Sequence, residues 1–151
     1  MKRVHVLGIG SPAGDDRAGW CVVDALRARL GVRAGVALDK LDRPGAGLLA
    51  HLEHTTHALL IDAVSRGAAP GTLRRVNRAD WRNHAGGLSS HGFGVFDARA
   101  RAEALGSLPP TLTLYGVEIG AAAPGAALTP AVQAAVAELA ARIADSLFCK
   151  F

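Results

Sequence analysis

The chain has 151 residues, of which half are hydrophobic and one fifth are charged, and it carries a net charge of +4. This length suits one domain with a proper core, spanning residues 1–151, and no apolar run is long enough to cross a membrane. The arginines are scattered without interleaved aromatic residues, so we expect no nucleic-acid partner. Cys21 and Cys149 fit no zinc spacing and no secretory leader precedes them, which indicates reduced thiols in a cytoplasmic protein. We expect the protein to be a monomer.

Apolar strands alternate with helical patterns along the chain, which predicts a layered α/β fold. The continuous apolar run that ends at Asp62 suits a central parallel strand, and the shorter, more polar segment 72–76 suits an edge. We expect a three-layer α/β/α sandwich around a mostly parallel five-stranded sheet with one antiparallel edge strand. The expected strands are at about 3–9, 34–41, 58–61, 72–76 and 111–117, and the expected helices at about 17–30, 44–52, 92–104 and from 130 onwards.

Two of these helices show a clear apolar face. The first places Trp20, Val23, Leu26 and Leu30 on one side. The last begins after Thr129, a residue suited to capping, with Pro130 at its first position. Its predicted core residues recur at helical spacing and are Val132, Val136, Leu139, Ile143 and Leu147.

The first strand runs into a glycine-rich turn that ends in the adjacent carboxylates Asp15 and Asp16. Functional groups of an open α/β sheet gather past the carboxyl ends of its strands, so this acidic pair indicates a cation or metal site. Gly8, Gly10 and Gly14 loosely resemble a dinucleotide turn, but carboxylates at that place would repel a phosphate. A nucleotide-binding protein therefore remains an alternative, and stabilisation by NAD or ATP would test it.

Two further polar residues are expected at the same edge of the sheet. Asp62 follows the central strand, and His91 lies at the start of a predicted helix after a long loop. With Asp16 they form a donor set suited to a borderline divalent metal. Each has a purely structural interpretation as well. Asp16 would cap the first helix, Asp62 would cap the next turn, and His91 would be a loop histidine bonded to a neighbouring serine.

The ordered set of motifs resembles the hydrogenase maturation proteases, nickel-dependent endopeptidases of the HybD type. The resemblance covers nearly the whole chain. Ser11 stands where the family has Asn, and it can still hydrogen-bond within the turn. The matching segments are Gly8-Ile9-Gly10-Ser11, Asp15-Asp16 with Gly19, Leu60-Ile61-Asp62-Ala63, Pro70-Gly71-Thr72, Ser89-Ser90-His91, Leu112–Glu118 and Leu128-Thr129-Pro130.

The resemblance implies an endopeptidase that removes a C-terminal extension from the nickel-loaded precursor of a [NiFe]-hydrogenase large subunit. Asp16, Asp62 and His91 then correspond to the catalytic, metal-contacting residues, with nickel supplied by the precursor. We expect these three groups to converge in an open cleft where substitutions leave the fold intact. A non-proteolytic metal-binding chaperone using the same ligands is the second alternative, and precursor cleavage would separate the two.

The remaining polar residues leave open questions. Asp39 or Asp42, after the second strand, could serve catalysis or substrate positioning, or both could be surface carboxylates. His51, His54 and His57 recur at a spacing of three, but a helix does not keep all three on one face. We interpret them as exposed loop histidines that bind no metal.

Overall fold

The computed structural model describes residues 4–31, 35–42, 51–52, 55–65, 67–77, 109–120 and 127–150. Its centre is a five-stranded sheet of order β2-β1-β3-β5-β4. The strands are β1 (Val4–Gly10), β2 (Val36–Asp42), β3 (His57–Val64), β4 (Leu73–Asn77) and β5 (Thr111–Glu118). All neighbours pair in parallel except β4, which runs antiparallel to β5 at the edge. The predicted sheet, including its polar antiparallel edge strand, is confirmed.

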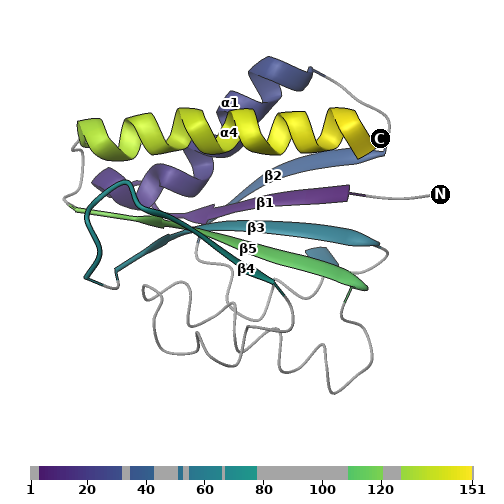
Figure 1. Ribbon diagram of the computed structural model, residues 1–151, viewed down its shortest axis with the longest axis horizontal. Helices are drawn as coiled ribbons and strands as arrows, with labels where there is room; N and C mark the ends of the chain where they lie inside the picture. The colour runs from purple at the N-terminus through teal and green to yellow at the C-terminus, as the bar shows by residue number, and fades with distance from the viewer. Residues whose placement is uncertain are drawn as a thin grey trace.

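Two helices lie together on one face of this sheet, α1 (Ala18–Leu30) and α4 (Pro130–Lys150) (Figure 1). A 3₁₀ turn, η1 (Gly14–Arg17), leads from β1 into α1. Of the two other predicted helices, only His51 and Leu52 belong to the described residues, and both are helical. Within the described part of the chain, no helix combines the length and apolar character needed to cross a membrane.

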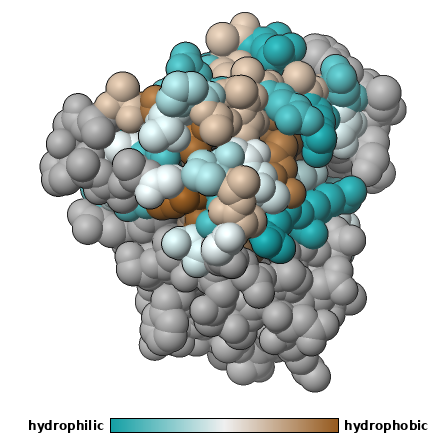
Figure 2. All heavy atoms as spheres, turned by 60° about the vertical axis from the view of Figure 1, so that its left-hand side comes forward, coloured by the Kyte–Doolittle hydropathy of each residue, from teal (hydrophilic) through white to brown (hydrophobic). Residues whose placement is uncertain are grey.

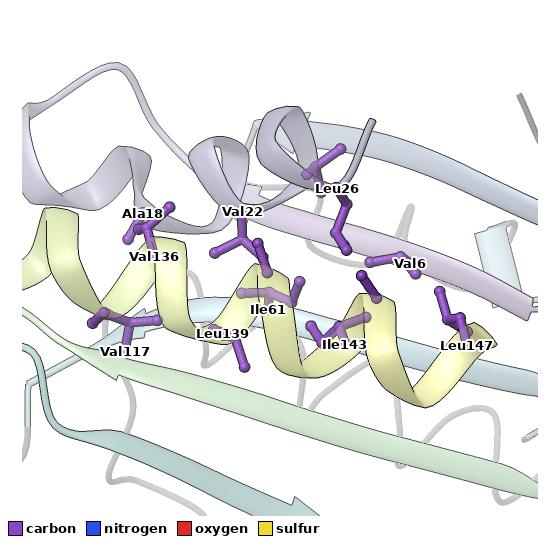
Figure 3. Close-up of a cluster of buried hydrophobic side chains, with 14 of the residues drawn as sticks. Val6, Ala18, Val22, Leu26, Ile61, Val117, Val136, Leu139, Ile143 and Leu147 are labelled. Atoms are coloured by element: carbon purple, nitrogen blue, oxygen red, sulfur yellow. The ribbon is translucent and has the colours of Figure 1, made fainter. Parts of the chain in front are cut away.

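The core between the helices and the sheet consists of aliphatic side chains (Figure 3). All five predicted core residues of α4 are at most 6% exposed. The predicted buried face of α1 was partly wrong, because Trp20 and Leu30 are only half-buried while Val22 is fully buried. The reason is that α1 faces both α4 and the sheet, which selects Ala18, Val22, Val23 and Leu26 for burial.

The opposite face of the sheet is buried too. Leu7 and Ile9 of β1, and Leu60 of β3, are 0% exposed, although they alternate with residues that face the helices. This pattern is what a central parallel strand requires. Strand β3 extends further than predicted, through Asp62 to Val64, because its pairing with β5 continues to Glu118.

Candidate functional site

The carboxyl ends of β1 and β3 lie side by side beneath the start of α1. Gly8 of β1 pairs with Ile61 of β3, so Ile9 is level with Asp62. A Cβ atom added to Gly19 would come within 2.5 Å of the carbonyl oxygens of both Ile9 and Ile61. The first turn of α1 therefore rests directly on the two strands, and any group in the turn between β1 and α1 lies at this edge.

Gly8 and Gly10 of the first motif are explained by the same close packing of backbones. A Cβ atom on Gly8 would lie 2.4 Å from the carbonyl oxygen of Gly19, and one on Gly10 would lie 2.5 Å from that of Asp16. Close backbone packing of β1 against η1 and α1 thus explains the glycines. The loose similarity to a dinucleotide turn needs no bound phosphate.

The structure gives the adjacent carboxylates different environments. Asp15 is 0% exposed, and its oxygens accept three hydrogen bonds from the described residues. The amide N–H of Thr129 donates to Oδ1 at 2.8 Å, the Thr129 hydroxyl donates to Oδ2 at 2.9 Å, and the N–H of Gly120 donates to Oδ2 at 3.0 Å. Asp15 thereby joins the turn after β1 to the segment after β5 and to the start of α4. This structural role was not predicted.

Asp16 is half-buried and lies within η1. The Ser11 hydroxyl donates to its Oδ2 at 3.3 Å, which confirms that Ser11 hydrogen-bonds within the turn. The N-cap residue of η1 is Ala13 and that of α1 is Arg17, so Asp16 occupies neither N-cap position. Its carboxylate lies in the first turn of η1 and remains a candidate for contact with a ligand.

Asp62 is 0% exposed and lies inside β3, two residues before the strand ends. Its Oδ1 accepts the N–H of Ala63 at 2.8 Å. Because Ile61 faces the helices, the pleat directs Asp62 to the other face of the sheet. The prediction that Asp62 would follow the strand and stand in an open cleft was wrong, since the strand continues beyond it and buries it.

A second buried acid shares this part of the sheet. Glu118, the last residue of β5, is 1% exposed, and its register partner is Val64. Strand alternation puts it on the same face as Asp62, whose partner is Gly116. Glu118 was not predicted as part of the site, although an acid at the end of an apolar strand is the same signal that marked Asp62.

The two acids of β2 lie at different positions along the strand. Asp42 is exposed and pairs in register with Gly10, at the carboxyl edge. Asp39 pairs with Leu7, in the middle of the strands, and its carboxylate contacts His5. Of these two acids, Asp42 is therefore the one that lies at the edge with Asp16.

His91 lies outside the described residues, as do His54 and the predicted loop 79–92. The expected convergence of Asp16, Asp62 and His91 thus stays a prediction. The interpretation of His51 and His57 as exposed loop residues was wrong: both are half-buried, His51 in a helical turn and His57 at the start of β3.

Cys21 of α1 is unsuited to nucleophilic catalysis. Burial is the main cause that raises the pKa of its thiol above the ordinary value, and the Coulomb effect of Arg17 lowers it less. Cys21 is a free thiol. A thiol of raised pKa stays protonated at neutral pH, so it is a poor nucleophile.

Comparison with known proteins decides which family has this arrangement. The sequence model of the HycI hydrogenase maturation proteases matches residues 22–146. The chain belongs to the hydrogenase maturation protease family. The hydrogenase expression/formation proteins HupM of Azotobacter chroococcum and HupD of Rhodobacter capsulatus are each 32% identical to it, over 76% and 78% of the chain. The chain spans 56% and 57% of the length of these curated relatives.

Solved structures of this protease family have the same fold. The hydrogenase maturating endopeptidase HybD from E. coli superposes with a TM-score of 0.86 at 28% identity, covering 96% of this chain and 91% of HybD. The solution structure of an endopeptidase from E. coli gives a TM-score of 0.82 at 29% identity, with the same coverage of both chains. HybD from Thermococcus kodakarensis, at 23% identity and a TM-score of 0.75, shares the fold. The predicted family and fold are both confirmed.

Proposed function

We propose that this chain is an endopeptidase that removes a C-terminal extension from the nickel-loaded precursor of a [NiFe]-hydrogenase large subunit. Membership of the maturation protease family supports the activity. The similarity to HybD from E. coli, a hydrogenase maturating endopeptidase, supports it too. The single observation that carries the proposal is the pair of carboxylates, Asp16 in η1 and Asp62 in β3, at one edge of the sheet.

The proposed chemistry follows from the donor set. Asp16, Asp62 and His91 supply two carboxylates and an imidazole, which suit a borderline divalent metal such as nickel. In this proposal they complete the coordination of nickel that the precursor already holds. The peptide carbonyl is then polarised, or a water molecule is activated with a carboxylate as general base. Cleavage follows nickel insertion because the protease binds the loaded precursor better than the empty one.

The surface at the start of α1, beside the η1 turn that holds Asp16, is mixed in character. The side of the molecule where α1 and α4 begin comes forward in Figure 2, and its described surface has small hydrophobic areas among hydrophilic and neutral residues. Transient protein interfaces have such a mixed character. We place the reaction in the cytoplasm, with a monomeric protease, and we propose that Asp42, exposed beside Gly10, contacts the substrate.

The test is cleavage of a purified, nickel-loaded precursor, followed as a mobility shift. We expect Asp16→Asn, Asp62→Asn and His91→Ala each to slow processing at least about 100-fold, because asparagine keeps the shape of aspartate but loses the charge that a cation requires. Asp16→Asn should change the free energy of unfolding by less than about 0.5 kcal/mol, since its side chain is only half-buried. Asp62→Asn, at a fully buried position, requires circular dichroism to confirm its fold first.

Two controls complete the experiment. Asp24→Asn changes an acid of α1 whose side chain is 53% exposed, and it should process at the parent rate. Nickel-free precursor should not be cut by the parent protein. Near-parent processing by all three site variants would show that the assigned residues are wrong, and equal cutting of nickel-free precursor would reject nickel as the recognition element.

A further inference from the structure

On the face of the sheet opposite α1 and α4, we infer a second metal site, formed by His5, Asp39 and His51 and suited to zinc or a similar divalent cation. One ligand atom from each residue lies within 4.8 Å of the other two. His5 comes from β1 and Asp39 from the neighbouring strand β2, which lie beside each other in Figure 1. His51 belongs to the helical turn that precedes β3.

The hydrogen bonds of His5 support this assignment. Its Nδ1 lies 2.9 Å from the carbonyl oxygen of His51, and a carbonyl only accepts, so Nδ1 carries a hydrogen and donates. This leaves Nε2 as the ring atom that can bind a ligand, and it lies 2.5 Å from Oδ2 of Asp39. The two atoms would have to move apart by about 0.8 Å for both to coordinate one zinc ion.

The contact with the His51 carbonyl is also the one that metal-binding histidines make. Such histidines donate their other ring N–H to a carbonyl or carboxylate, which fixes the tautomer and the ring orientation. Here the donor and the carbonyl belong to residues 46 positions apart, so the fold has to bring them together. The His51 ring lies across from that of His5, with centroids 6.1 Å apart.

The ligand types indicate which metal the site suits, and the exposure of the side chains indicates whether an ion can reach it. Two imidazoles and one carboxylate suit zinc-like ions and are poor ligands for calcium or magnesium. In a tetrahedral zinc site neighbouring ligand atoms are about 3.3 Å apart, so only a small movement is needed. The side chain of His5 is 14% exposed and that of Asp39 is 50% exposed, which leaves a route for the ion and a position for water.

This site is distinct from the proposed protease site. His5 lies five residues before Gly10, at the opposite end of β1 from the turn that holds Asp16. Its occupation would link β1, β2 and the turn at His51, so we expect a structural effect. The inference does not depend on protease activity and is tested without it.

The experiment is calorimetric titration of the full chain with Zn²⁺, and with Co²⁺ as a spectroscopic probe of histidine ligation. We expect one tight equivalent in the parent protein and a rise in melting temperature on binding. His51→Ala and Asp39→Asn should each weaken zinc affinity by about 10- to 100-fold or more. Both changes lie outside the apolar core, so these variants are expected to fold even if His5→Ala does not.

Two matched controls locate the metal. His57→Ala removes another half-buried histidine, which lies by a Thr56 hydroxyl at the start of β3, and should leave zinc affinity unchanged. Asp16→Asn should also leave it unchanged. Loss of the tight equivalent in Asp16→Asn would overturn the inference. So would parent-like affinity in both His51→Ala and Asp39→Asn, or an absence of zinc binding by the parent protein.

Discussion

At the scale of single residues, the adjacent acids Asp15 and Asp16 show how burial separates identical side chains. Asp15 is enclosed and accepts its hydrogen bonds from Gly120 and Thr129, whereas Asp16 is half-buried and bonds to Ser11 of its own turn. A buried carboxylate is stable only when donors surround it. Asp15 therefore maintains the architecture of the edge at which Asp16 lies.

We expect Asp15→Asn to reduce the free energy of unfolding by about 2–3 kcal/mol. An asparagine amide has one acceptor oxygen, and its NH₂ group would face an N–H or hydroxyl donor that now bonds to the carboxylate. Urea denaturation of the purified variant measures the change.

The matched comparison for Asp15 is Asp24→Asn, which breaks a 3.0 Å ion pair with Lys40 between side chains that are 53% and 39% exposed. Exposed pairs contribute at most about 1 kcal/mol. If the two variants lose equal stability, the hydrogen bonds of Asp15 do not have the importance that its burial indicates.

At the scale of elements, the position of α1 over β1 and β3 depends on contacts between backbones. Gly19 allows the first turn of α1 to touch the strand carbonyls of Ile9 and Ile61. This contact places η1, and with it Asp16, at the carboxyl edge. Helix propensity alone predicts that alanine in place of Gly19 would stabilise α1. The close contact with the strand carbonyls predicts the opposite, because it leaves no room for a Cβ atom.

Gly19→Ala should destabilise the protein by about 1–3 kcal/mol, because a Cβ atom 2.5 Å from two carbonyl oxygens forces α1 away from the sheet. Thermal unfolding followed by circular dichroism measures the change. Ala28→Gly, at an exposed position of the same helix, measures the effect of helix propensity without the steric conflict. It should lower the free energy of unfolding by about 1 kcal/mol. A stabilising Gly19→Ala would contradict the close packing.

At the scale of the whole molecule, α4 connects regions that are distant in the sequence. Thr129, just before α4, bonds to Asp15, and the helix then packs on α1 and β5. Leu139 and Ile143 are each 1% exposed within the cluster that also contains Val6 and Ile61 (Figure 3). This core includes residues near both ends of the described chain, so we propose that the chain unfolds as a single cooperative domain.

We expect Leu139→Ala to lower the free energy of unfolding by about 2–5 kcal/mol through the cavity it creates. The far-UV circular dichroism and tryptophan fluorescence transitions should still coincide, and the urea dependence should keep its slope. Separate transitions for the two probes would show that α4 unfolds independently and would reject the single domain. Ala137→Gly, at an exposed position of α4, controls for changes in helix propensity.

Local patterns were sufficient for the sheet and for the core of α4. Runs of apolar residues and 3.6-residue periodicity depend only on sequence neighbours, which is why the strands, the polar edge strand β4 and the buried residues from Val132 to Leu147 were predicted correctly. The buried face of α1 was less predictable, because a helix with two neighbours buries a face that its own periodicity does not define. The placement of Asp16 at the end of β1 was predictable for the same reason as the strands.

The sequence by itself determined the α/β class, the family and the residues available for chemistry, since these follow from composition, periodicity and ordered motifs. Only the tertiary structure decided what each polar residue does. It buried Asp62 within β3, bonded Asp15 to Thr129, and brought His5, Asp39 and His51 together. The physical reason is that burial and hydrogen-bond partners are set by strand register and helix docking between segments far apart in the chain, which no local pattern specifies.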